Sequence, residues 1–205
     1  MKTIAALAGL LFLQDAKVKI TVDVTQVTEL QEWGDRAKAL CEEWYPKMSD
    51  YLSTDGFTPP QEASLIFEKD RKGVAATSGA KIRIAAEWVK KHPEDLGMVI
   101  HELAHVVQSY KNGSPGWVTE GIADYVRYFL YEKKAVTPKD KRKGSYKDAY
   151  RTTASFFAWL VGAHDKEIVK KLNAAMRGGK YSDDLFKDWT GKDLETLWKD
   201  YLAAD

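Results

Sequence analysis

The sequence predicts an α+β fold in which a small mixed sheet with one helix is followed by a mainly helical half. Short runs that alternate polar and β-branched side chains occur before about residue 86, whereas from Trp88 onward apolar side chains recur with the period of a helix. Hydrophobic residues make up 44% of the 205 positions, enough to build a large core. No linker or change in composition divides the chain, so we expect one domain over residues 17–205.

The N-terminal part contains four strand-like segments and one long helical segment. Residues 17–24 alternate polar and β-branched side chains, which predicts a half-buried strand. Residues 28–52 carry apolar side chains every three or four positions, which predicts a helix. The pairs Asp55-Gly56 and Pro59-Pro60 then break the chain into a loop. Three short strand-like runs follow at residues 63–68, 74–77 and 81–86.

The C-terminal part is predicted to be helical. Pro93 is expected to open a helix, because acidic residues follow it where negative charge suits the helix dipole. The pair Asn112-Gly113 is expected to end this helix. A second helix is expected from about Thr119 to Glu132. Further helices are expected at residues 146–161, 165–176 and 192–203.

The N-terminus carries the pattern of a secretory signal. Lys2 is followed by an apolar run over residues 4–13, which is too short for a membrane span of about 20 residues. We therefore expect residues 1–16 to be removed by cleavage after Ala16. The mature protein would then work outside the cytoplasm, in an extracellular or periplasmic space. The alternative is that this run forms a buried N-terminal helix or strand.

Charge and cysteine content argue against two classes of protein. Lys and Arg number 31 and Asp and Glu number 30, so the net charge of +1 is too small for a general nucleic-acid binder. A single cysteine, Cys41, excludes an intramolecular disulfide framework. Because Cys41 lies among apolar neighbours, we expect it to act as a small buried hydrophobic side chain.

The chemistry of the chain centres on the pentapeptide HELAH at residues 101–105, an H-E-x-x-H motif within an apolar helical segment. Residues four apart face the same side of a helix, so His101 and His105 can converge on one zinc ion. Glu102 is rotated off that face and can act as a general base toward a water molecule. The alternative is a buried pair of histidines held by hydrogen bonds alone, which is a poor way to fill a core.

A catalytic zinc site needs a third protein ligand and an open fourth position. In the next helical segment Glu120 and Asp124 lie four residues apart and therefore point to one side. We expect Glu120 to bind the metal. We expect Asp124 to accept the N–H of a liganding histidine, with His101 as first candidate, which would fix the ring tautomer. The alternative is Asp124 as ligand with Glu120 exposed. The expected cofactor is one Zn²⁺ per chain.

These motifs resemble those of known zinc enzymes. HELAH followed by WVTEGIADYV is similar to the gluzincin zinc metallopeptidases, which combine H-E-x-x-H with a downstream glutamate. The segments ITVDV, EEWYPKMSDYL, GVAATSG, PGWVTEGIADYVRY and YRTTASFFAWL also resemble the basic secretory protein family of plants and bacteria, over about residues 17–201. The resemblance implies a zincin-like fold and a zinc peptidase. The chain departs from the family name because it is nearly neutral.

The resemblance also implies a residue that stabilises the oxyanion of the tetrahedral intermediate. The segment that begins at Tyr150 looks like the tyrosine motif of aminopeptidase-type gluzincins, and a phenol can donate a hydrogen bond to developing negative charge. Tyr146 and Tyr131 are alternatives, and another possibility is that Tyr150 only packs on the core at a helix start. We interpret His92 and His164 as surface residues at helix starts and not as metal ligands.

The resulting hypothesis is a secreted, monomeric zinc peptidase that hydrolyses peptide or protein substrates with Glu102 as general base. The resemblance implies that an exposed strand edge, at residues 74–77 or 81–86, pairs with extended substrate. The sequence has no Gly-x-Met-Glu-Asn segment of the kind that anchors a substrate α-amine, so an endopeptidase is favoured. Two alternatives are a non-catalytic interaction or defence protein with a structural zinc, and a zinc hydrolase of a non-peptide amide. Neither a nucleic-acid partner nor a membrane span is expected.

Overall fold

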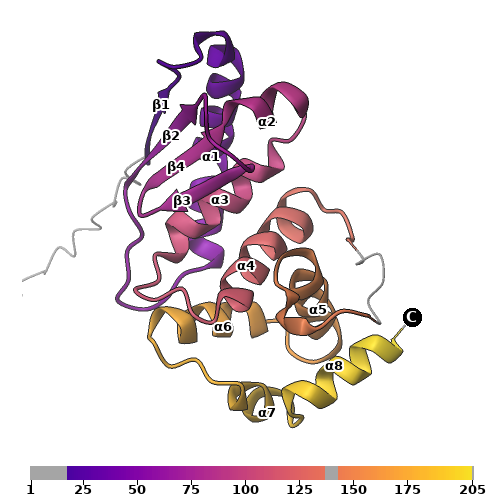
Figure 1. The fold of residues 1–205 in the computed structure, drawn as a ribbon. Coiled ribbons are helices and arrows are strands. Elements are labelled where there is room, and N and C mark those ends of the chain that lie inside the picture. The colour runs from indigo at the N-terminus through magenta and orange to yellow at the C-terminus, as the bar shows by residue number, and fades with distance from the viewer. Residues whose placement is uncertain (1–17, 137–142, 205) are drawn as a thin grey trace, which may run out of the picture.

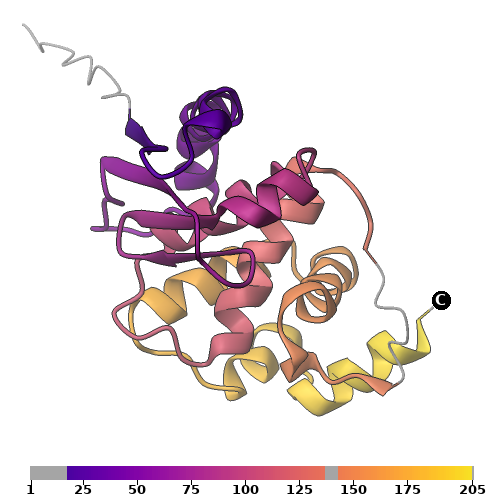
Figure 2. The same ribbon diagram turned by 45° about the horizontal axis from the view of Figure 1, so that its top comes forward.

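A sheet and a helical half are joined through two central helices, and the α+β fold class is confirmed (Figure 1). The structure is a computed structural model that describes residues 18–136 and 143–204. Figure 2 shows the same arrangement turned toward the viewer, with the helices α3 and α4, defined below, between the sheet and the C-terminal helices. The secretory signal expected at residues 1–16 lies outside the described residues and stays a prediction.

Four strands of the described chain form one mixed sheet. They are β1 (Lys19–Asp23), β2 (Glu62–Glu68), β3 (Ala75–Ser78) and β4 (Lys81–Ala85). Their order in space is β1-β2-β4-β3, with β1, β2 and β4 parallel and β3 antiparallel to β4. In β2 every second side chain is buried, at Ala63, Leu65 and Phe67, because successive residues of a strand point to opposite faces. The predicted strands are therefore confirmed, and β3 lies at one edge of the sheet.

The predicted helix over residues 28–52 is present as a 3-10 turn, η1 (Thr28–Leu30), followed by α1 (Gln31–Tyr51). The helix packs directly on the sheet: a Cβ atom added at Gly34 would lie 2.8 Å from Cγ1 of Val22 in β1. The absence of a Cβ atom at Gly34 therefore permits the close approach of α1 to β1. Cys41 is fully buried on the same helix, as expected, and burial raises the pKa of its thiol to about 12.

Two helices follow the sheet, α2 (Ala86–Lys91) and α3 (Gly97–Gln108), and the prediction that a helix opens at Pro93 is wrong. The residues after Pro93 form a turn instead. The carboxylate of Asp95 accepts a hydrogen bond of 3.3 Å from the backbone N–H of Met98, and so satisfies one of the free donors at the start of α3. Asp95, one of the acidic residues that suggested a helix start at Pro93, therefore lies just before the helix and accepts a hydrogen bond from its first turn.

The segment between α3 and α4 (Gly116–Tyr125) reverses the direction of the chain. The metal-motif helix α3 ends earlier than Asn112-Gly113, because Ser109 takes a left-handed conformation with φ 43° that cannot continue a helix. The next helix starts earlier than the predicted Thr119, directly after Pro115, whose φ of −77° suits a helix start. The reversal brings the two helices side by side.

The helix α4 continues into η2 (Val126–Tyr131), a π-helical segment. Gly121 of α4 lies against Thr153 and Phe157 of α5 (Tyr150–Ala163), and a Cβ atom at Gly121 would lie 2.9 Å from Cβ of Thr153. The close contact between these two helices therefore depends on glycine. Single π-helical turns often mark functional sites, and this one directly continues the helix that carries Glu120.

The C-terminal half differs from the prediction at helix starts and by a short helix at residues 184–190 that the sequence did not predict. The predicted helix over residues 146–161 is interrupted at Ala149 (φ 62°), so that η4 (Tyr146–Asp148) precedes α5. Three more helices complete the half: α6 (Ile168–Arg177), α7 (Asp184–Thr190) and α8 (Leu194–Ala203). Asp193 caps α8 by accepting a hydrogen bond of 2.7 Å from the backbone N–H of Thr196. None of the helices in the described part of the chain has the length and apolar character needed to cross a membrane.

Candidate metal centre

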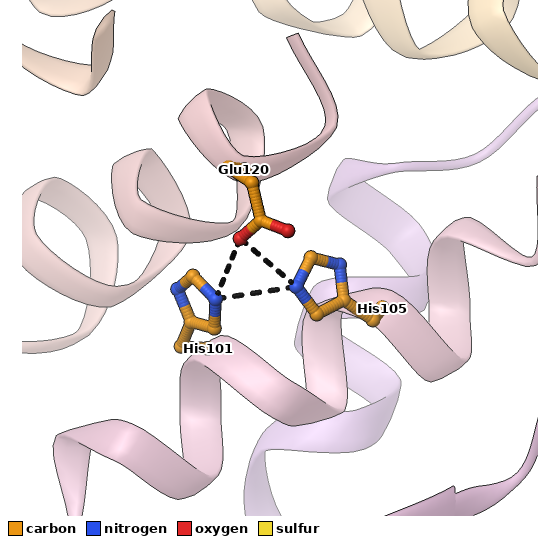
Figure 3. A group of neighbouring side chains, drawn as sticks. All are labelled: His101, His105 and Glu120. Atoms are coloured by element: carbon orange, nitrogen blue, oxygen red, sulfur yellow. Dashed lines mark hydrogen bonds and ion pairs between the residues drawn. The ribbon is translucent and has the colours of Figure 1, made fainter. Parts of the chain in front are cut away.

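The helix α3 presents two histidines, one turn apart, to a glutamate of α4 (Figure 3). Nε2 of His101 and Nε2 of His105 lie 3.2 Å apart, and the two rings are nearly perpendicular at 86°. Oε2 of Glu120 lies 3.2 Å from Nε2 of His101 and 3.4 Å from Nε2 of His105. The structure thus brings together, from two helices, the three residues that the sequence analysis selected as metal ligands.

This donor set fits a zinc ion. Tetrahedral bonds of about 2.0–2.1 Å would place neighbouring ligand atoms about 3.3 Å apart, and the observed separations of 3.2 to 3.4 Å are of that size. Two imidazole nitrogens and one carboxylate oxygen leave one position of a four-coordinate site for water or substrate. Across residues 18–136 and 143–204, His101, His105 and Glu120 are the group of three His, Cys, Asp or Glu residues that could hold a metal ion.

Hydrogen bonds on the far side of each imidazole orient the two rings. Nδ1 of His101 lies 2.7 Å from Oδ1 of Asp124, and Nδ1 of His105 lies 2.8 Å from Oε1 of Gln108. Both partners are oxygen acceptors, so each Nδ1 carries the proton, and in a neutral ring Nε2 presents its lone pair to the point shared with Glu120. Asp124 therefore contacts His101 at the nitrogen that faces away from Glu120, which argues against Asp124 as a metal ligand.

Gln108 is a site residue that the sequence analysis missed. Besides accepting from His105, its side chain donates a hydrogen bond of 3.0 Å from Nε2 to the backbone carbonyl of Thr119. It therefore connects the end of α3 to the residue before Glu120. The signal that identifies Gln108 is its spacing: it follows His105 by three residues, which places both side chains on one face of the helix.

The electrostatics of the three side chains favour a cation at their shared point. Burial alone would lower the pKa of His101, but hydrogen bonds to Asp124 and Glu120 outweigh burial and raise this pKa to about 9. Burial alone would raise the pKa of Glu120, but hydrogen bonds to His101 and His105 lower it to about 2. Glu120 is therefore a carboxylate at neutral pH, and it attracts positive charge toward the two ring nitrogens.

Glu102 is buried beside the metal-binding group and is held by the edge strand β3. Its Oε2 accepts a hydrogen bond of 2.7 Å from Oγ1 of Thr77, and the same hydroxyl lies 3.1 Å from the backbone carbonyl oxygen of Glu102. No spacing in the sequence identifies Thr77 as a partner of Glu102, because only the tertiary fold brings β3 against α3. The contact fixes the position of the carboxylate relative to the edge strand.

The metal-binding group lies in a cleft of about 1110 Å³. Its lining comes from β3, from α2, α3 and α4, from the segments that flank α3, from η2, and from residues around the start of α5. Like β1 at the opposite edge of the described sheet, β3 is paired on one side alone, whereas β4 is paired on both sides, by β2 and β3. Of the two candidates for an exposed strand edge, residues 74–77 and 81–86, the structure therefore places the edge at the first, in β3.

Tyr150 lines this cleft, and the two alternative tyrosines are not among its lining residues. The Tyr150 side chain is exposed, and its ring lies nearly parallel to that of His101, with 6.1 Å between the centroids. Tyr146 is buried instead and donates a hydrogen bond of 2.8 Å from its hydroxyl to Oε1 of Glu195. Tyr131 packs edge-on against a tryptophan of α1. Position therefore favours Tyr150 over Tyr146 and Tyr131.

The backbone around Tyr150 is strained. Ala149 and Tyr150 have φ values of 62° and 46°, in the left-handed region that side chains with a Cβ rarely adopt. Such strain persists where the surrounding structure enforces it, often at functional sites. The negative charge of Glu120, followed by burial, raises the pKa of Tyr150, so the phenol keeps its proton and can serve as a hydrogen-bond donor.

The other two histidines lie outside the cleft lining. The expectation that His92 and His164 stand at helix starts is wrong, because they follow the last residues of α2 and α5. Their rings lie 4.2 Å from Trp88 and 5.0 Å from Trp159, respectively. Neither belongs to the group of described residues that could hold a metal ion.

A comparison with known protein families finds a model that matches most of the chain. The family model described as "BSP: Peptidase of plants and bacteria" matches residues 19–201. No curated protein and no solved structure matches the chain. The matched range contains the whole described sheet, the three residues of the metal-binding group, and Glu102.

Proposed function

The chain belongs to the BSP peptidase family of plants and bacteria, and from this premise we propose that it is a zinc-dependent peptidase that acts through His101, Glu102, His105 and Glu120. One observation carries the proposal: three ligand atoms converge from two helices, and a buried carboxylate lies next to them. A structural zinc site has no use for that additional carboxylate, whereas hydrolysis needs a general base.

His101, His105 and Glu120 would hold the ion, while Asp124 and Gln108 orient the two imidazoles. When bound, zinc supplies Lewis-acid chemistry, which increases the acidity of a water molecule and polarises a carbonyl oxygen. The protein's own contribution is to fix the ligand positions and to leave one side of the group open to the cleft.

Glu102 moves the proton in this proposal. Its Oε2 is held by Thr77, and Oε1 has no hydrogen-bond partner among the described residues. Oε1 accepts a proton from the water that attacks the scissile carbonyl carbon. It then delivers this proton to the amide nitrogen, so that the C–N bond breaks and the amine leaves.

Tyr150 donates a hydrogen bond from its phenol to the carbonyl oxygen as negative charge develops there. Its proximity to His101 and its exposure to the cleft support this role. The strained backbone at Ala149 and Tyr150 holds the phenol at this place before substrate binds, which reduces the cost of ordering it.

The edge strand β3 offers free backbone hydrogen-bonding groups to an extended peptide. Binding of this kind uses the main chain of the substrate, which suits cleavage within a chain, so we propose an endopeptidase. We also propose that the protein acts outside the cytoplasm, as the signal-like N-terminus suggests, and that it acts as a monomer.

The proposal is tested with zinc-loaded full-length protein, casein and a quenched peptide library. We expect about one zinc per chain, cleavage within the peptides, loss of cleavage with 1,10-phenanthroline, and recovery when zinc is added back. Zinc binding without cleavage would indicate a structural zinc in an interaction protein. Cleavage confined to non-peptide amides would indicate a different hydrolase.

The residues that orient the histidines lead to a separate prediction. Asp124→Ala and Gln108→Ala should each weaken zinc binding about 10–100-fold, because each leaves one imidazole without the acceptor that fixes its tautomer. Competition with a chromogenic zinc chelator measures the affinity. Asp35→Ala, at an exposed aspartate of α1, is the matched control. If Asp124→Ala binds zinc as tightly as Asp35→Ala, the orienting role is wrong.

A further inference from the structure

The cleft contains two arginines, and one of them is already neutralised. The carboxylates in the described lining are Asp95, Glu102, Glu120, Asp124 and Asp148. Arg127 donates hydrogen bonds of 2.6 Å to Oδ1 of Asp95 and 2.9 Å to Oε1 of Glu132, so its charge is balanced within the protein. Arg151 is the other arginine of the lining. It has no carboxylate partner among the described residues.

The side chain of Arg151 is exposed, but a hydrogen bond fixes the position of its Nε. It lies in the first turn of α5, directly after Tyr150. Its Nε donates a hydrogen bond of 2.8 Å to the hydroxyl of Tyr128, a buried residue of η2, and Cζ lies 5.1 Å from the centroid of that ring. The guanidinium group is thus held at Nε, close to the hydroxyl end of an aromatic ring, while the two Nη groups have no partner among the described residues.

The remaining donors have the geometry of a carboxylate site. An arginine can bind a carboxylate through two parallel N–H···O bonds, and with Nε occupied by Tyr128 the pair Nη1 and Nη2 is still available. Because Tyr128 already holds the guanidinium at Nε, less side-chain entropy is lost when a ligand binds. The carboxylates that line the rest of the cleft repel anions electrostatically. We therefore expect an anionic group of a ligand to bind at Arg151.

We propose that Arg151 is a specificity-determining residue that binds a carboxylate of the peptide substrate. The proposal rests on the proposed peptidase function. Tyr150 links Arg151 to the reacting centre, because its ring lies 6.1 Å from that of His101. The bound carboxylate therefore belongs to a residue close to the scissile bond. It comes either from an acidic side chain, as an endopeptidase requires, or from the free C-terminus of the substrate, in which case the protein removes C-terminal residues and is not an endopeptidase.

Matched peptides and variants test the proposal. One peptide series carries glutamate or glutamine next to the scissile bond, and a second series carries a free or an amidated C-terminus. In one of the two series the wild-type kcat/KM should be about tenfold higher for the carboxylate form, and this ratio should fall to about one in Arg151→Met. Arg151→Lys should keep part of the ratio, because an ammonium group cannot form the two parallel bonds. Arg36→Met, at an exposed arginine of α1, is the control and should keep the wild-type ratio.

A binding measurement separates this proposal from the proposed function. In zinc-loaded full-length protein carrying Glu102→Gln, fluorescence anisotropy should show about tenfold weaker binding of the carboxylate peptide when Arg151→Met is added. Binding that depends on Arg151, without hydrolysis by the wild type, would support the carboxylate site and refute the peptidase function. An unchanged kcat/KM ratio together with unchanged binding in Arg151→Met would overturn the proposal. The series that shows the preference identifies the source of the carboxylate.

Discussion

Replacing Glu102 by glutamine is expected to lower kcat for peptide hydrolysis about 10²–10⁴-fold, the usual contribution of a general acid–base residue. Glutamine has nearly the same size and can still accept the hydrogen bond that Thr77 donates, so the local structure should be preserved. It cannot take a proton from water at neutral pH. The zinc content should stay at the wild-type value, because Glu102 is not one of the three residues of the metal-binding group.

The measurement combines initial rates on a quenched peptide with metal analysis of the same samples. Glu32→Gln, at an exposed glutamate of α1, is the matched control and should keep both activity and zinc. If Glu102→Gln cleaves the peptide at the wild-type rate, the proton-transfer role is wrong, even if zinc is bound. Loss of zinc in Glu102→Gln would instead show that the substitution disturbs α3.

The part of the site that the sequence could predict depends on local geometry. His101 and His105 share a helix face because they are four residues apart, and this holds wherever the helix lies in the fold. Glu120 and Asp124 share a face for the same reason. Their positions relative to the histidines required only that two neighbouring helices pack side by side, which the short connection between them favours.

The residues that sequence reasoning missed depend on tertiary contacts. Thr77 reaches Glu102 because the sheet places its edge strand against α3, and no spacing in the sequence shows this. Arg151 is held by Tyr128, which is 23 positions earlier in the chain and lies in a π-helical segment that a helical repeat does not predict. Gln108 is different, since its spacing from His105 carried the information.

The errors in the predicted helix boundaries have a similar cause. Pro93 and the acidic residues after it are typical of a helix start, but Asp95 is engaged by Arg127 and by the indole of Trp88, and α3 begins only at Gly97. Ala149 interrupts a pattern that is helical in the sequence. Asp95 and Ala149 both line the cleft. At these positions tertiary contacts at the site override the local preference for helix.

Replacing Glu120 by alanine is expected to weaken zinc binding by more than the about 10–100-fold expected for Asp124→Ala, because a ligand is lost and not only its support. Two imidazoles alone leave the ion without the negative charge that Glu120 supplies at neutral pH. Peptide hydrolysis should be lost in parallel with zinc. Competition with a chromogenic chelator gives the affinity, and activity at increasing zinc concentration shows whether excess metal restores cleavage.

A control is needed because Glu120 also contacts both histidines and could affect folding. Glu120→Gln keeps the size of the side chain and can still bond to His101, so comparing its thermal unfolding without zinc with that of Glu120→Ala separates folding from metal binding. Glu32→Ala is the matched surface variant and should bind zinc like the wild type. If Glu120→Ala retains wild-type zinc affinity while Asp124→Ala loses it, the third ligand is Asp124, and the convergence of His101, His105 and Glu120 has another explanation.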